Sequence, residues 1–198
     1  MISSSVASAR DGEARRVRVS VSGTVQGVGF RPFIYRLAQS LGLGGFVRND
    51  ACGVAIEVQG ARSSVERFLT RLVSEAPPHA RIGGVEVGEL AIVAEALAFA
   101  VEDSRADGAT AASIPPDLAT CDDCLRELFD RENRRYRYPF INCTNCGPRF
   151  TIASRIPYDR ASTTMAAFPM CDVCRREYDD PASRRFHAQP NACPACGP

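Results

Sequence analysis

The alternation of apolar and polar residues near the start of the chain predicts its first regular elements. Residues 16–22 place three valines on one face, which is the pattern of a half-buried strand. Pro32 suits the first turn of a helix, and apolar residues at helical spacing over 33–41 continue this helix until Gly42 ends it. The chain therefore begins with a strand that is followed by an amphipathic helix.

Shorter alternating runs further along the chain predict the remaining strands of the same unit. These strands are residues 46–49, 54–58 and 85–87, with an edge strand at 99–101. The stretch Ser63-Ser64-Val65-Glu66 is a capping box that predicts the start of a second helix, which Pro77 and Pro78 end. The order βαββαβ is the split βαβ arrangement of ferredoxin-like α+β folds.

The stretch between the first strand and the first helix carries the first candidate chemistry. Its sequence is Gly23-Thr24-Val25-Gln26-Gly27-Val28-Gly29-Phe30-Arg31. Gly27 and Gly29 allow the backbone to approach a ligand closely, and successive N–H groups beside a helix N-terminus form a concave anion site. Arg31 adds a fork of donors that matches phosphate or carboxylate. A turn with a solvated arginine would explain half of this pattern.

Asn49, at the end of the predicted strand 46–49, is the second candidate. In a split βαβ sheet this outer strand can bring its last residue near the loop that follows the first strand. The side-chain amide offers both donors and an acceptor, so it could hold a water in line with a phosphorus atom bound by the loop and Arg31. Capping of the hairpin turn at residues 50–53 is the alternative explanation.

Composition and charge narrow the classes of protein that remain. The 198 residues suit one large or two small domains, and 45% hydrophobic and 24% charged residues are ordinary for a globular protein. A formal net charge of +1 gives no global electrostatic reason to bind nucleic acid or a membrane. No apolar run approaches the roughly 20 residues that span a bilayer, and no signal peptide is visible. We expect a cytoplasmic protein with a disordered start.

Cysteine pairs dominate the second half of the chain. They are Cys121 with Cys124, Cys143 with Cys146, Cys171 with Cys174, and Cys193 with Cys196. Eighteen residues separate the first pair from the second and the third from the fourth, and the whole unit repeats after fifty residues. This spacing predicts two structural zinc sites of four thiolates each, with adjacent pairs sharing a metal as the simplest choice. Iron–sulfur clusters and disulfides are the alternatives.

Basic and aromatic residues alternate between the cysteine pairs, in Arg134-Arg135-Tyr136-Arg137-Tyr138 and Arg184-Arg185-Phe186-His187. Such a pattern beside zinc sites is also typical of nucleic-acid binding. Acidic residues in the same half offset the charge, and no twelve-residue finger helix with a histidine pair is present, which argues against that function. We interpret His187 as a hydrogen-bonded structural residue rather than as a fifth metal ligand.

Two stretches of the first half resemble the signatures of acylphosphatases. They are the loop 23–31 and Gly45-Phe46-Val47-Arg48-Asn49, which a turn and the strand 53–58 follow. The resemblance covers roughly residues 15–103 and implies that the amides of residues 25–31 and the Arg31 guanidinium bind phosphate. It also implies that Asn49 positions the attacking water. Hydrolysis of an acyl phosphate needs charge stabilisation and a positioned water more than a strong base, which fits these residue types.

The second half resembles the zinc module of the HypF-type carbamoyltransferases that mature nickel–iron hydrogenases. The similar stretches are residues 121–128, 138–150, 157–160 and 184–190. In that family the module follows an acylphosphatase-like domain, so the resemblance covers about residues 15–198. It implies two zinc ions, carbamoyl phosphate as substrate, and a hydrogenase-maturation partner for the full-length family. It also implies that this chain is a fragment without the ATP-dependent and transferase domains.

These patterns and resemblances predict a domain plan and a function. The plan has a disordered start at 1–14, an acylphosphatase-like domain at 15–103, a linker at 104–113 and a zinc module at 114–198, with knuckles at 121–146 and 171–196. We expect hydrolysis of carbamoyl phosphate to phosphate and carbamate, as the first step of carbamoyl transfer. The alternative is a catalytically idle, zinc-dependent module that binds a protein or, less in keeping with the charge, nucleic acid.

Overall fold

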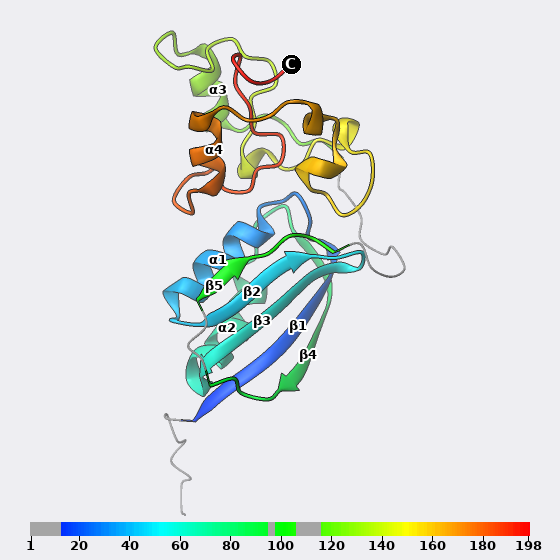
Figure 1. The fold of residues 1–198 in the computed structure, drawn as a ribbon, viewed down its shortest axis with the longest axis vertical. Helices are drawn as coiled ribbons and strands as arrows, with labels where there is room; N and C mark the ends of the chain where they lie inside the picture. The colour runs from blue at the N-terminus through cyan, green and yellow to red at the C-terminus, as the bar shows by residue number, and fades with distance from the viewer. Residues whose placement is uncertain (1–12, 95–97, 106–115) are drawn as a thin grey trace, which may run out of the picture.

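The computed structural model describes residues 13–94, 98–105 and 116–198, and its first half is built on one sheet. The strands are β1 (Ala14–Thr24), β2 (Gly44–Asn49), β3 (Gly53–Ala61), β4 (Arg81–Leu90) and β5 (Phe99–Val101). The helices are α1 (Phe30–Ser40) and α2 (Arg62–Ser74). The sheet order is β4-β1-β3-β2-β5, which confirms the ferredoxin-like α+β fold and its edge strand (Figure 1).

The hydrophobic periods of the strands and helices account for the core. Val17, Val19 and Val21 of β1 are at most 2% exposed, because alternate side chains of a strand point to the same face. They share one hydrophobic cluster with Ile34 of α1 and Phe68 of α2. The apolar stripes of both helices therefore pack against one face of the sheet, as their spacing predicts.

The sheet topology brings the two candidate segments of the first half together. β1 and β2 each run antiparallel to β3, so they point in the same direction on either side of it. Ser22 pairs with Gly53, and Asn49 pairs with the next residue, Val54. The loop after β1 and the last residue of β2 therefore lie close together, where the C-terminal ends of these two strands meet.

Two local expectations about the elements need correction. β4 is ten residues long rather than the three at 85–87, because it pairs with β1 along most of its length. The predicted capping box at 63–66 is wrong, since α2 begins at Arg62 and its start has no side-chain cap. β3 leads directly into α2, and the Arg62 N–H donates to the Glu13 carbonyl at 3.0 Å, which satisfies one of the donors that the first turn of a helix leaves without an intrahelical partner.

The start and the linker of the predicted domain plan fall largely outside the described residues. Residues 1–12 of the expected disordered start lie outside them, whereas Ala14 already belongs to β1. Residues 106–113 of the expected linker also lie outside them. The Arg105 N–H donates to the Asn49 carbonyl at 3.0 Å, so the chain still follows β2 beyond residue 103.

The second half consists of two short helices and a series of turns (Figure 1). Helix α3 (Asp122–Phe129) and helix α4 (Asp172–Asp179) each begin directly after the first cysteine of a knuckle. The 3₁₀ turns are Thr144–Cys146, Phe150–Ile152, Arg160–Ser162 and Thr164–Ala167. Neither helix follows from the hydrophobic pattern, because eight residues carry too few apolar positions to show a helical period. Across the described part of the chain, no helix is long and apolar enough to cross a membrane.

The two knuckles brace each other through the arginines that lie between the cysteine pairs. Arg135 of the first knuckle binds Glu177 of α4, with 3.0 Å between Nη1 and Oε1. Fifty residues further on, Arg185 binds Glu127 of α3 in the same way. Arg135 and Arg185 are both buried, so these side chains hold the module together instead of facing a nucleic acid.

Candidate active site

The loop between β1 and α1 presents a row of backbone donors. Within the described residues, the N–H groups of residues 26–31 have no hydrogen-bond acceptor. Gly27 (φ 73°) and Gly29 (φ 77°) adopt the left-handed conformation, which turns the loop into the start of α1. Val25 differs, because its N–H donates to the Gly23 carbonyl at 3.2 Å. Successive free donors at a helix N-terminus are an anion-binding arrangement.

The buried side chain of Gln26 holds this loop in place. Its Nε2 donates to the carbonyls of Asp50 at 2.8 Å and Gly53 at 2.9 Å, in the turn between β2 and β3. Its Oε1 accepts from the Tyr158 N–H of the second module at 2.9 Å. One glutamine therefore links the loop to its own sheet and to the second module.

Arg31 and Asn49 contact each other at the edge of the sheet. With the Asn49 amide oriented so that its oxygen faces the guanidinium, this oxygen accepts from Arg31 Nε at 3.3 Å and from Nη2 at 3.2 Å. Nη2 also donates to Asp159 Oδ1 of the second module at 2.7 Å. Arg31 is 8% exposed and Asn49 is 1% exposed. Among the described residues Nη1 of Arg31 has no hydrogen-bond partner, so it is available to donate a hydrogen bond to an anion.

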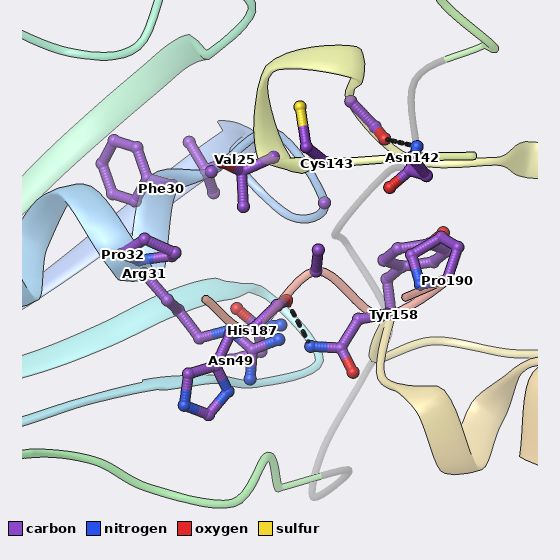
Figure 2. A pocket seen from close by; sticks show the side chains of 16 residues that line it. Val25, Phe30, Arg31, Pro32, Asn49, Asn142, Cys143, Tyr158, His187 and Pro190 are labelled. Atoms are coloured by element: carbon purple, nitrogen blue, oxygen red, sulfur yellow. Dashed lines mark hydrogen bonds between the residues drawn. The ribbon is translucent and has the colours of Figure 1, made fainter. Parts of the chain in front are cut away.

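The second module forms the opposite wall of this site. A Cβ on Gly27 would lie 2.6 Å from Pro148 Cβ and 3.0 Å from Tyr158 Cδ1, so the approach of the modules also requires a glycine there. The pocket between them is lined by the loop, Arg31 and Asn49 on one side, and by residues from 142–147, Tyr158 and 187–190 on the other (Figure 2). The pocket is small, with a cavity volume of about 20 Å³.

His187 is a residue of this pocket that the sequence interpretation missed. Its ring packs on Tyr178 and Phe186, with centroids 4.9 and 4.6 Å away, and it lies near Arg31 (Figure 2). It belongs to neither cysteine group, and within the described residues its buried Nδ1 has no hydrogen-bond partner, contrary to the expected structural bond. Arg137 occupies the equivalent position fifty residues earlier with the same left-handed backbone. The change from Arg137 in the first repeat to His187 in the second is the sequence feature that could have indicated a special role for His187.

The protonation of His187 predicts a pH dependence of folding stability. Burial, and after it the charge of Arg31, lowers the pKa of His187 to about 4. The unfolded chain binds this proton below about pH 6.5 and the folded chain does not, so stability decreases as the pH falls from there towards 4. The decrease is up to about 3 kcal/mol. We expect His187→Asn, which tolerates the left-handed backbone, to remove this part of the slope in denaturant titrations. Parallel slopes in both proteins would contradict the prediction.

The eight paired cysteines form two compact groups. Cys121, Cys124, Cys143 and Cys146 make one group, and Cys171, Cys174, Cys193 and Cys196 make the other. The adjacent pairs share a group, as predicted. Neighbouring sulfur atoms lie 3.6 to 3.9 Å apart, far beyond the roughly 2.05 Å of a disulfide. Four ligands about 2.3 Å from one tetrahedral ion would lie about 3.8 Å apart, so each group fits a metal ion.

Arginines from the opposite knuckle surround each sulfur group. Arg184 Nη1 lies 3.2 Å from Cys124 Sγ, and Arg134 Nη2 lies 3.2 Å from Cys174 Sγ. Four thiolates around a divalent ion carry a net charge of about −2, which these guanidinium groups offset. Each group of four cysteines is therefore stabilised by arginines of the other repeat.

Comparisons with known proteins agree with this two-part organisation. The acylphosphatase family matches residues 17–101, and the HypF finger family matches residues 120–153 and 170–198. An acylphosphatase of Caldivirga maquilingensis is 46% identical over 92 residues, which are 46% of this chain and 96% of that protein. The chain therefore combines an acylphosphatase domain with a HypF finger module.

Longer relatives contain both parts in one chain. Carbamoyltransferase HypF2 of Cupriavidus necator is 54% identical over 155 residues, which cover 78% of this chain and 19% of that protein. The crystal structure of full-length HypF in a phosphate- and nucleotide-bound form superposes with a TM-score of 0.86 at 47% identity, over 93% of this chain and 24% of that one. The first half of this chain therefore belongs to the acylphosphatase family, and the chain as a whole is similar to the N-terminal region of HypF proteins. It spans about a fifth of the length of the carbamoyltransferase relatives.

Proposed function

We propose that this chain hydrolyses acyl phosphates at the pocket between its two halves, with carbamoyl phosphate as the substrate. The observation that supports this most directly is the convergence of three features: the N–H groups of residues 26–31, which have no acceptor among the residues that the structure describes, Arg31 and Asn49. Together they offer donors for a phosphoryl group and an amide for a water. The sequence similarity of this part of the chain to acylphosphatases agrees with this chemistry.

The proposed reaction is an in-line displacement at phosphorus. The loop amides and Arg31 hold the phosphoryl oxygens, and Asn49 holds a water on the far side of the phosphorus from the acyl oxygen. The water oxygen forms a bond to phosphorus while the bond from phosphorus to the acyl oxygen breaks. The electron pair of the broken bond stays on the acyl oxygen and leaves with carbamate. Both protons of the water remain on the phosphate, so carbamoyl phosphate dianion and water give carbamate and dihydrogen phosphate.

The surroundings of the pocket suit a substrate with a good leaving group. His187 is the histidine that lines the pocket, and its lowered pKa keeps it neutral near pH 7. It is therefore a poor proton donor to a leaving group, whereas carbamate leaves without protonation. The burial of Arg31 strengthens the attraction between its guanidinium and the phosphoryl charge.

The small size of the pocket and the names of the longer relatives favour carbamoyl phosphate among the acyl phosphates. The small pocket leaves little room for an aryl or long alkyl group. The longer relatives are named carbamoyltransferases, so release of carbamate fits the first step of carbamoyl transfer. We propose that this step serves the maturation of nickel–iron hydrogenases, with a maturation protein as the partner of the longer relatives.

We further propose that the two cysteine groups hold structural zinc ions. Four thiolates complete the tetrahedral coordination of zinc and leave no position for a substrate, so the metal would act through folding. Reduced thiolates of this kind are typical of the cytoplasm, which we propose as the compartment. The zinc module would then keep Tyr158 and Asp159 against the loop and Arg31.

The test of the proposed function is phosphate release from carbamoyl phosphate, corrected for its uncatalysed decay. We expect turnover of carbamoyl phosphate and of acetyl phosphate, and none of glycerol phosphate, because an alkoxide leaves poorly without an acid. Absence of turnover with both acyl phosphates, in a protein loaded with two metal ions, would contradict the proposal.

A further inference from the structure

Asn142 places a buried acceptor in the wall of the pocket, and this acceptor has no donor within the described part of the chain. The residue is 3% exposed and lines the pocket. Its Nδ2 donates to the Gly147 carbonyl at 3.3 Å, whereas its Oδ1 is buried and has no hydrogen-bond partner among the described residues. The bond to Gly147 fixes the amide orientation, because a flip would set two oxygen atoms against each other.

The metal knuckle itself does not require an asparagine at this position. In the internal repeat Ala192 is the equivalent residue, and it is similarly buried. The equivalence holds in three dimensions, because the Asn142 carbonyl accepts from Arg185 Nε at 3.1 Å and the Ala192 carbonyl accepts from Arg135 Nε at 2.8 Å. The second knuckle therefore builds the same structure with a methyl group where the first has the amide.

The position of Asn142 suits the acyl end of a bound substrate. Asn49 and Arg31 lie at one end of the pocket and Asn142 lies at the other (Figure 2). In-line displacement places the leaving group across the phosphorus from the water that Asn49 holds. The acyl group would therefore point towards Asn142.

A buried acceptor without a donor costs about 1–3 kcal/mol, so a ligand that supplies a donor there gains affinity. The carbamoyl group carries two N–H donors where acetyl carries a methyl group. We propose that Asn142 Oδ1 accepts a hydrogen bond from the amino group of carbamoyl phosphate and so sets the preference for carbamoyl over acetyl phosphate. This inference rests on the proposed hydrolysis and names the residue that selects its substrate.

Acetyl phosphate is a nearly isosteric control, so the test is the ratio of kcat/KM for carbamoyl phosphate to that for acetyl phosphate. We expect Asn142→Ala to lower this ratio about five- to tenfold, as loss of one hydrogen bond would. Acetyl phosphate hydrolysis should change little. Asn142→Asp retains an oxygen at the same position, so its ratio should stay near that of the unaltered chain even if its charge slows both reactions.

Asn191→Ala is the matched structural control. Asn191 is also buried close to a metal-binding cysteine, where its Oδ1 accepts from Arg135 and its Nδ2 donates to the Cys174 carbonyl, but it does not line the pocket. Its loss should leave the ratio unchanged. Equal losses for both substrates in Asn142→Ala, with two metals still bound, would overturn the role of Asn142 and leave the proposed hydrolysis standing. Failure of the unaltered chain to hydrolyse either substrate would instead overturn the proposed function.

Discussion

Arg31→Ala is expected to lower kcat/KM for carbamoyl phosphate by about two to three orders of magnitude. The guanidinium is nearly buried, Asn49 and Asp159 fix its orientation, and its Nη1 remains available to the phosphoryl group. Since it would contact the phosphate both before and during transfer, we expect a higher KM together with a lower kcat. Initial rates of phosphate release over a range of substrate concentrations separate the two effects.

Asn49→Ala should act mainly on kcat, with a decrease of about a hundredfold and little change in KM. The amide would hold the attacking water, which contributes to the transition state and not to substrate binding. Arg48→Ala is the control for both variants. Arg48 precedes Asn49 on β2, forms an ion pair with Glu102 at 2.9 Å and does not line the pocket. Wild-type rates in Arg31→Ala and Asn49→Ala, or an equal loss in Arg48→Ala, would contradict the proposed roles.

Loss of one metal ion is expected to release both. Cys124→Ser removes a ligand of the first group, and the structural zinc of small domains provides roughly 10–16 kcal/mol of apparent binding free energy. The first knuckle should therefore lose its structure, and with it the bonds from Arg134 and Arg135 to Glu177 and from Arg184 and Arg185 to Glu127. These bonds join the knuckles, so the bound metal should decrease from two ions per chain towards none.

Metal content and amide hydrogen exchange together test this cooperativity. The sheet of the first half should stay protected, because its core cluster of valines, Ile34 and Phe68 contains no cysteine of either group. Cys52→Ser is the matched control, since Cys52 is exposed in the turn between β2 and β3 and belongs to neither group. A Cys124→Ser chain that keeps one metal ion and an intact second knuckle would refute the cooperative loss.

Much of the first half could be predicted from local pattern. Alternation marked β1 and β3, helical spacing marked α1 and α2, and Gly42 ended α1 as expected. The start of α2 could not be predicted in the same way. Ser63 and Glu66 match the sequence pattern of a capping box, but α2 begins one residue earlier at Arg62, whose N–H donates to the Glu13 carbonyl from a distant part of the chain. A local rule fails where a contact with a distant part of the chain supports a different start of the helix.

The candidate site divides in a similar manner. Arg31, Asn49 and the loop glycines were identifiable because their chemistry needs particular residue types in a particular order. The wall that faces them was not, because Asn142, Asp159 and His187 belong to the second module and lie far from Arg31 along the chain, with 128 positions between Arg31 and Asp159. The repeat of fifty residues carried a signal for two of these residues, since Asn142 and His187 depart from it.

The sequence alone determined the βαββαβ order, the glycine-rich loop and the four Cys-x-x-Cys pairs, because each depends on period, spacing or residue type within a short segment. Which pairs share a group was decided by the tertiary structure. The tertiary structure decided how the halves meet. Gln26 binds the Tyr158 N–H, Asp159 binds Arg31, and each knuckle supplies arginines to the other. Such contacts arise from packing between distant segments, which local pattern does not encode. They turn an open anion loop into a pocket with a wall from each half of the chain.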